Sequence, residues 1–315
     1  MILKRLSPPH DYPPFADLPV QYITVGAASR QLAVHVSGHF TVDQPPIVCV
    51  PGFIRNMSDF GDFMRHYRQI ASVDWPFVLV DLSGRGRSGR HDHADNYSAL
   101  SDAHDLSTIT RALGISRAIF VGQGHGGQVI MALAAQHPAL LAAAVLINSG
   151  PTTNPRGLVR LRSNLRYLEG VRGNDQIRAA ARRILITDYP GLPEATLDQL
   201  ATRTHFIDTK ERLHGIFDPD LVQFLDAFEH DDVFEPQWHL FNALAHIPLM
   251  LARTQLTDRL DNETFDQMIA RRPDATVVRL AGEGSPALLN SEDEVAVIAD
   301  FVAQAGKSPR RWARY

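Results

Sequence analysis

Short, nearly continuous apolar runs recur along the chain, and stretches with helical periodicity lie between them. Runs of this length suit strands that are buried on both faces of a parallel sheet. Because runs and helical stretches alternate, we expect an α/β fold whose parallel strands are joined by right-handed crossovers. The apolar runs are residues 47–50, 77–82, 118–121 and 142–147, and helical patterns cover residues 58–70, 99–113 and 126–136.

The alternation is interrupted once. Residues 152–235 have mainly helical periodicity and are too long for a single crossover, so we expect an inserted helical cap there. The tail KSPRRWARY suits either a frayed end or an arm that docks a partner. The chain is thus expected to consist of a proline-rich arm (1–18), a core (19–151 and 236–306), the helical cap (152–235) and a basic tail (307–315).

Composition narrows the function classes. With 31 basic and 35 acidic residues, the formal charge of −4 offers no field for nucleic acid or anionic membranes. A single cysteine, Cys49, removes internal disulfides, cysteine-rich zinc sites and redox pairs. No apolar run approaches the roughly 18 residues of a membrane helix, and the first residues lack the pattern of a secretory signal. We therefore expect a cytoplasmic protein that uses neither a cofactor nor a metal.

The segment VGQGHGG, from Val121 to Gly127, follows an apolar run and opens a helical pattern. Its glycines suit a sharp turn from strand to helix, where the backbone is strained and closely packed. The segment is similar to the nucleophile elbow, G-x-S-x-G, of α/β-hydrolases. In that family the turn holds the nucleophile above the sheet and aims the next backbone N–H at a developing oxyanion.

Four further landmarks follow the order of this family. VPGF at 50–53 resembles its His-Gly oxyanion loop with proline for histidine, and DLSGRGRS at 81–88 resembles its D-x-R-G-x-G-x-S turn. RTQLTD at 253–258 follows an apolar run where many members carry the triad acid. GEGS at 282–285 follows the last run, where the family has its catalytic histidine.

The chain thus resembles the α/β-hydrolase superfamily, of the capped type that acts on small molecules, over roughly residues 20–151 and 236–305. The resemblance implies a mostly parallel eight-stranded sheet flanked by helices, with the cap inserted after the sixth strand. It also implies a pocket at the carboxyl ends of the strands, under the cap. A small organic molecule is then the expected partner, and a protein substrate is not.

The catalytic positions depart from the family pattern. Gly124 stands where the nucleophile belongs, Ser285 stands where the histidine belongs, and Asp258 keeps the acid position. Asn148 fills a second acid position that some members use after the sixth strand. In a serine protease, loss of the nucleophile or the base alone costs about 10⁶ in turnover. Hydrolysis by a serine triad is therefore not expected.

Part of the family's machinery is retained. The backbone N–H groups of Phe53 and His125 stand at the positions of the oxyanion hole, and Gly124 leaves extra room for a water or a ligand group. The His125 side chain suits a pocket wall, a base for a bound water, or a hydrogen bond to a ligand. Ser285 suits a loop residue bonded near Asp258, or a relocated nucleophile without a visible base.

Other residues are candidates for the site. Arg55 and Asn56 follow the oxyanion loop and suit either ligand contact or structural hydrogen bonding. Trp238 and His239, where the cap rejoins the core, suit either the pocket mouth or core packing. The pair His91 and His93, with Asp95 and His104 nearby, is a weak metal signal without a third ligand at fixed geometry, so we expect a solvated loop there.

Three functional hypotheses follow. The first is a non-hydrolytic, ligand-binding relative of the hydrolases. The second is an enzyme, a hydrolase or a lyase or isomerase acting on a small carbonyl or ester compound, that uses the oxyanion hole, His125 and Asp258 without a covalent serine intermediate. The third is an ordinary hydrolase that was deliberately inactivated, which two unlike changes make the weakest of the three.

Overall fold

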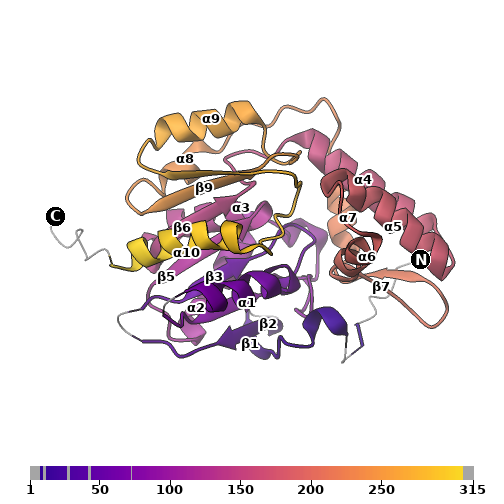
Figure 1. Ribbon diagram of the computed structural model, residues 1–315, viewed down its shortest axis with the longest axis horizontal. Coiled ribbons are helices and arrows are strands. Elements are labelled where there is room, and N and C mark those ends of the chain that lie inside the picture. Colours follow the sequence, from indigo (N-terminus) through magenta and orange to yellow (C-terminus); the bar gives the residue numbers. More distant parts are fainter. Residues whose placement is uncertain (1–7, 10–11, 27–28, 42–43, 72, 308–315) are drawn as a thin grey trace.

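An eight-stranded sheet forms the centre of the computed structural model, which describes residues 8–9, 12–26, 29–41, 44–71 and 73–307 (Figure 1). The strand order is β1-β2-β4-β3-β5-β6-β9-β10. Strand β2 pairs antiparallel with both β1 and β4, and all other pairs in this sheet are parallel. The expected mostly parallel sheet is confirmed. Its strands are β1 (Gln21–Val25), β2 (Arg30–Ser37), β3 (Ile47–Val50), β4 (Phe77–Val80), β5 (Ala118–Gln123), β6 (Leu141–Ile147), β9 (Leu249–Thr254) and β10 (Thr276–Leu280).

Burial on both faces explains the continuous apolar runs of the central strands. In β3, Ile47 and Cys49 belong to one apolar cluster, whereas Val48 and Val50 belong to the cluster on the opposite face. Every residue of β3, β4, β5, β6 and β9 is buried. Alternation between the two faces therefore produces no alternation of polarity in these strands.

Two layers of helices cover the sheet (Figure 1). On one face, α1 (Gly61–Ile70) packs against α10 (Glu292–Lys307), and their apolar residues join one core cluster. Residues of the remaining core helices join the cluster on the other face. These helices are α2 (Ala99–Ala112), α3 (His125–Gln136), α8 (Trp238–Asn242) and α9 (Asn262–Arg271).

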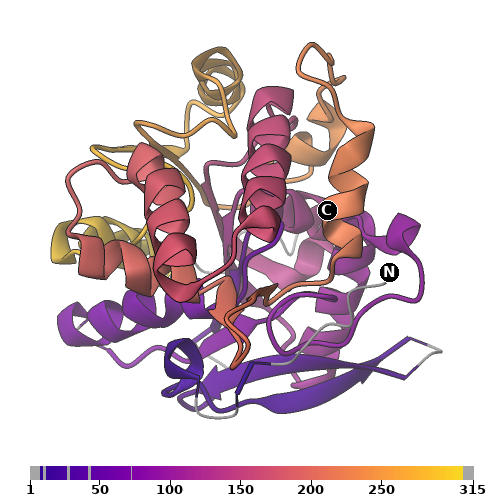
Figure 2. The same ribbon diagram turned by 90° about the vertical axis from the view of Figure 1, so that its right-hand side faces the viewer.

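Residues 155–227, here called the inserted segment, lie between β6 and α8 in the chain. Their helices and strands gather at one end of the sheet (Figures 1 and 2). Besides helices, the inserted segment contains the hairpin β7–β8, which was not expected because strands of three residues are too short to show a period. Its elements are α4 (Pro155–Gly170), α5 (Asn174–Asp188), α6 (Glu194–Thr202), β7 (His205–Ile207), β8 (Leu213–Gly215), α7 (Asp220–Phe224) and the 3-10 helix η5 (Leu225–Ala227).

The described part of the N-terminal arm connects the core with the inserted segment. The Tyr12 hydroxyl lies 2.9 Å from the carbonyl oxygen of Thr202 and 2.6 Å from that of His205, and Phe15 is buried in the core. The expected basic tail lies outside the described residues after Lys307. None of the described helices has the length and apolar character needed to cross a membrane. Four short 3-10 helices complete the fold: η1 (Pro13–Phe15), η2 (Met57–Phe60), η3 (Ala94–Asn96) and η4 (Pro138–Leu140).

Candidate functional site

Gly124 lies at the sharp turn between β5 and α3, with φ 52° and ψ −115°. This positive φ is uncommon for residues with a side chain and is the strained geometry expected of an elbow. The turn also needs Gly126, because a Cβ there would lie 2.1 Å from the carbonyl oxygen of Val50. By contrast, a Cβ on Gly124 would meet nothing within 4 Å among the described residues. The position therefore faces open space.

That space belongs to a cavity of about 580 Å³ between the carboxyl ends of the strands and the inserted segment. Gly124, Phe53 and His125 line it from the core, and the apolar side chains of Leu161 and Phe224 line it from the inserted segment. The volume falls in the range of small-molecule sites, about 300–1,000 Å³.

Ser285 also lines this cavity, but its hydroxyl has structural partners. The Ser285 Oγ lies 2.7 Å from the Thr257 Oγ1 and accepts a 3.0 Å hydrogen bond from the Asn148 amide. The Asn148 Oδ1 in turn accepts from the Thr254 N–H at 2.8 Å. Ser285 is thus bonded next to Asp258 rather than to Asp258 itself, and none of these partners is a base.

Asp258 is engaged by two arginines. It accepts from the Arg160 Nε at 2.5 Å, and the Arg259 Nε lies 3.3 Å away. Burial alone would raise the pKa of Asp258, but the guanidinium groups of Arg259 and Arg160 outweigh it and keep the pKa below its ordinary value. Asp258 is not among the lining residues and makes no hydrogen bond to Ser285 within the described chain. Asp258 therefore ties Arg160 of α4 to the core.

The inserted segment supplies polar lining that was not expected from the sequence. Arg160 also donates to Asp188 at 2.8 Å, and both residues line the cavity. His205 of β7 lines it too, and burial, followed by the nearby charge of Arg55, lowers the pKa of His205 to about 4. This imidazole is therefore neutral at pH 7.

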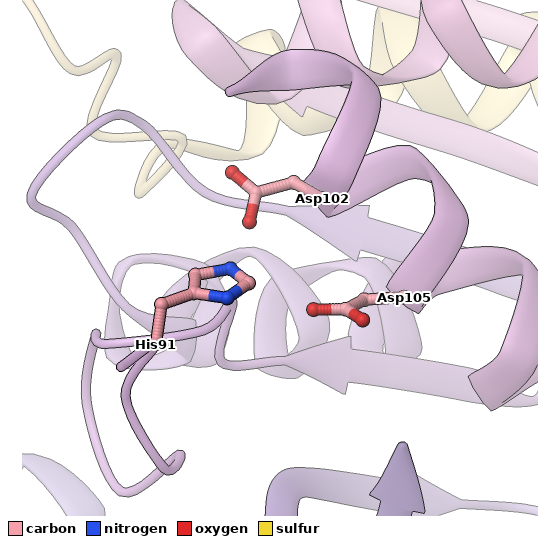
Figure 3. Close-up of side chains that lie close together, drawn as sticks. All are labelled: His91, Asp102 and Asp105. Atoms are coloured by element: carbon pink, nitrogen blue, oxygen red, sulfur yellow. The ribbon is translucent and has the colours of Figure 1, made fainter. Parts of the chain in front are cut away.

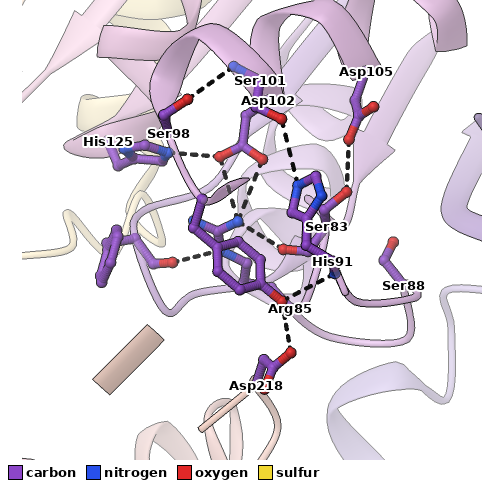
Figure 4. A network of polar contacts seen from close by, with 12 residues as sticks. Ser83, Arg85, Ser88, His91, Ser98, Ser101, Asp102, Asp105, His125 and Asp218 are labelled. Carbon is purple, nitrogen blue, oxygen red and sulfur yellow. Dashed lines mark hydrogen bonds and ion pairs between the residues drawn. The ribbon is translucent and has the colours of Figure 1, made fainter. Parts of the chain in front are cut away.

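His125 has a carboxylate partner, Asp102 of α2 (Figure 4). The His125 Nε2 lies 2.7 Å from the Asp102 Oδ2, and Asp102 is fully buried. Burial alone would raise the pKa of Asp102, but Arg85 and His125 outweigh it and hold the pKa below its ordinary value. The Phe53 ring lies edge-on to the imidazole, with 5.6 Å between ring centroids.

Arg85 lies beside this pair (Figure 4) and connects it to Phe53, in the segment after β3. Its side chain is fully buried, its Nη1 lies 3.3 Å from the Asp102 carboxylate, and its Nε donates to the Phe53 carbonyl oxygen at 2.7 Å. Sequence reasoning missed both Asp102 and Arg85. The available signal was Asp102 at helical spacing with Leu106 and Ile109, because a carboxylate on a buried helix face needs a charged partner.

Asp102 is also close to His91 and Asp105 (Figure 3). One ligand atom of each residue lies within 4.8 Å of the others, which is close enough for a shared metal ion. However, Arg30 binds both oxygens of Asp105 at 2.8 and 2.7 Å, and Arg85 pairs with Asp102. Since both carboxylates already face a guanidinium, this arrangement does not fit a cation. The absence of a metal site stays a prediction.

Of the remaining expected site residues, only Arg55 lines the cavity. Asn56 instead accepts from the Ser58 N–H at 3.0 Å and donates to the Arg203 carbonyl at 2.6 Å, so its role is structural. Trp238 packs against the apolar cluster under α2, α3, α8 and α9, with the Arg271 guanidinium over its ring. His239 is exposed. Neither lines the cavity, because α8 packs against α3 and not at the strand ends.

Glu283, two residues before Ser285, is buried. Burial raises the pKa of its carboxyl to about 7, and one carboxyl oxygen accepts from the Leu288 N–H at 3.1 Å. The folded state favours the protonated Glu283 carboxyl. The contribution of this carboxyl to the free energy of unfolding is therefore complete below its unfolded pKa near 4.5, and it is lost as pH rises through the folded pKa of about 7.

We therefore expect Glu283→Gln to gain stability relative to wild type between pH 5 and pH 8, by about 2 kcal/mol. Urea unfolding at several pH values measures this difference. The exposed Glu292→Gln is the matched control and should follow wild type at every pH. If the difference in unfolding free energy between Glu283→Gln and wild type were the same at every pH, the raised pKa of Glu283 would be contradicted.

Comparison with known proteins agrees with this fold. The family model described as alpha/beta hydrolase fold matches residues 45–191. The crystal structure of an alpha/beta hydrolase from Novosphingobium aromaticivorans superimposes with a TM-score of 0.78 at 26% identity, covering 91% of this chain and 98% of that one. The chain has the fold of the α/β-hydrolase superfamily. A hydrolase structure from Rickettsia typhi, at 16% identity and a TM-score of 0.75 over 91% and 99% of the chains, shares the fold.

Curated relatives match over smaller shares of this chain than these structures do. "Putative carbamate hydrolase RutD" of Caulobacter segnis is 37% identical over 81 residues, which is 26% of this chain and only 30% of that protein. The protein of the same name from Pseudomonas syringae pv. syringae is 29% identical over 66% of this chain and 85% of its own length. A 2-hydroxy-6-oxononadienedioate/2-hydroxy-6-oxononatrienedioate hydrolase of Paraburkholderia phymatum is 26% identical over 72% and 86%.

Proposed function

We propose that the protein binds a small carbonyl compound, of the ester or carbamate kind, without forming an acyl-enzyme. One observation carries the proposal: the elbow opens into a cavity, but no nucleophile–base pair stands there. Gly124 has no side chain, and the hydroxyl of Ser285 is bonded to Asn148 and Thr257. Asp258, the residue that would orient a histidine, is paired with Arg160.

The class of ligand follows from what the cavity retains. Phe53 and His125 remain beside Gly124, so their backbone N–H groups can donate to a carbonyl oxygen. Apolar side chains such as Leu161 and Phe224 suit the body of a small organic molecule. The names of the relatives, a carbamate hydrolase and a hydrolase of an oxo-acid, indicate carbonyl compounds for those proteins.

Calorimetric titration with benzyl carbamate and benzyl acetate tests the proposal. Wild type should bind one molecule per chain, and Gly124→Leu, which fills the open space at the elbow, should lower the affinity at least about tenfold. Gly124→Ala adds only a methyl group and is the matched control that should keep the affinity. Absence of saturable binding, or equal binding by Gly124→Leu, would contradict the proposal.

A further inference from the structure

We propose that His125, positioned by Asp102, is a catalytic base that activates a water molecule above Gly124 for attack on the carbonyl carbon of the bound ligand. The inference rests on the proposed ligand pocket and assigns a reaction to it. It places the base on the residue after the elbow glycine, with its carboxylate on α2, and it gives Asp258 no part in the chemistry.

The hydrogen bond to Asp102 decides which imidazole nitrogen is free. Asp102 is ionised beside Arg85 and accepts a hydrogen bond, so the His125 Nε2 carries the proton and Nδ1 carries the lone pair. Nδ1 bonds to no described residue, yet it is not one of the buried side-chain atoms that lack a partner. A lone pair is therefore accessible on a residue that lines the cavity.

The charges around this imidazole are few. Asp102 on α2 and Arg85 in the turn after β4 lie on its Nε2 side, and Phe53 covers one edge of its ring. Arg85 fixes both Asp102 and the carbonyl of Phe53, so one buried guanidinium positions the base and one side of the oxyanion hole together. Asp102 and Arg85 are positioning residues, because they act through His125 and Phe53.

Gly124 completes the arrangement by leaving room for the water. The His125 Nδ1 takes a proton from the water, and the oxygen of the resulting hydroxide bonds to the carbonyl carbon. The N–H groups of Phe53 and His125 then donate to the oxyanion. Collapse of the intermediate breaks the bond to the leaving group, which takes the proton back from the imidazolium. An ester and water thus give an acid and an alcohol without a covalent intermediate.

Hydrolysis of p-nitrophenyl acetate by the full chain tests this assignment. Wild type should turn over without a burst, and His125→Ala should lower kcat at least about a hundredfold while KM changes less than about threefold. Added imidazole should restore part of the rate of His125→Ala, which loss of a purely structural side chain would not allow. Asp102→Asn should lower kcat without rescue by imidazole, because His125 still fills the site.

Two controls keep the test decisive. His230→Ala removes an exposed histidine that does not line the cavity and should match wild type, which shows that loss of an arbitrary exposed imidazole does not lower the rate. His125→Gln replaces His125→Ala if the alanine variant does not fold. Saturable binding of benzyl carbamate without ester turnover would overturn the base and leave the ligand pocket standing, as would a His125→Ala rate within about twofold of wild type. Absence of both binding and turnover would overturn the pocket as well.

Discussion

The triple variant Gly124→Ser, Ser285→His and Asn148→Asp is expected to hydrolyse p-nitrophenyl acetate at least about a hundredfold faster than wild type, with a burst. Loss of the nucleophile or the base costs about 10⁶ in a serine protease, so even an imperfect triad should exceed the present site. The elbow backbone already has the required geometry, and a Cβ at Gly124 is free of contacts within 4 Å.

The choice of acid follows from the hydrogen bonds. Asn148 already contacts the side chain of Ser285, and its Oδ1 accepts from Thr254. An aspartate there keeps that acceptor and offers its second oxygen to a histidine at position 285. Asp258 cannot serve equally well, because Arg160 and Arg259 hold its carboxylate.

The matched control is the double variant Gly124→Ser and Ser285→His, which depends on Asp258 for its acid. We expect it to be at least about tenfold slower than the triple variant. Burst amplitude in stopped flow distinguishes acyl-enzyme formation from the water route. A folded triple variant with the activity of wild type would show that the elbow and the loop after β10 do not converge as described.

Asp102→Ala is expected to lower the free energy of unfolding by about 3–5 kcal/mol. Arg85 is fully buried and pairs with Asp102, so the substitution leaves a charge in the interior without its partner. Urea unfolding of wild type and variant measures the difference, with equal slopes as a check of two-state behaviour.

An exposed ion pair provides the comparison. Arg166 and Asp226 are 2.6 Å apart, but their side chains are 57% and 44% exposed. Asp226→Ala should therefore change stability by less than about 1 kcal/mol. If Asp102→Ala cost no more than Asp226→Ala, the buried network around Arg85 would not be what holds Asp102 and Phe53 in place.

Local patterns were sufficient to predict the fold and the elbow. Buried parallel strands require continuous apolar runs, and the glycines from Gly122 to Gly127 make a tight turn from strand to helix possible. The family's order of landmarks then located Gly124, Asp258 and Ser285. All three positions depend on backbone that follows a strand end, where position along the sequence and position in space are closely linked.

Local sequence patterns could not predict which residues these side chains contact. Arg160 pairs with Asp258 across 98 residues, and Asp102 pairs with His125 from a different helix. Nothing in either local sequence specifies these contacts, because they arise from how the inserted segment and α2 pack on the core. For the same reason, chain order alone leaves Trp238 and His239 between the pocket mouth and core packing, and neither lines the cavity because α8 packs against α3.

The most direct test of the central claim is the intact mass of wild type during reaction with p-nitrophenyl acetate, measured by rapid quench. Without a nucleophile–base pair at the elbow, the mass should stay that of the unmodified chain at all times, while the triple variant shows an acetyl adduct at position 124. A stoichiometric acetyl adduct on Ser285, or on any other residue lining the cavity of wild type, would contradict the account.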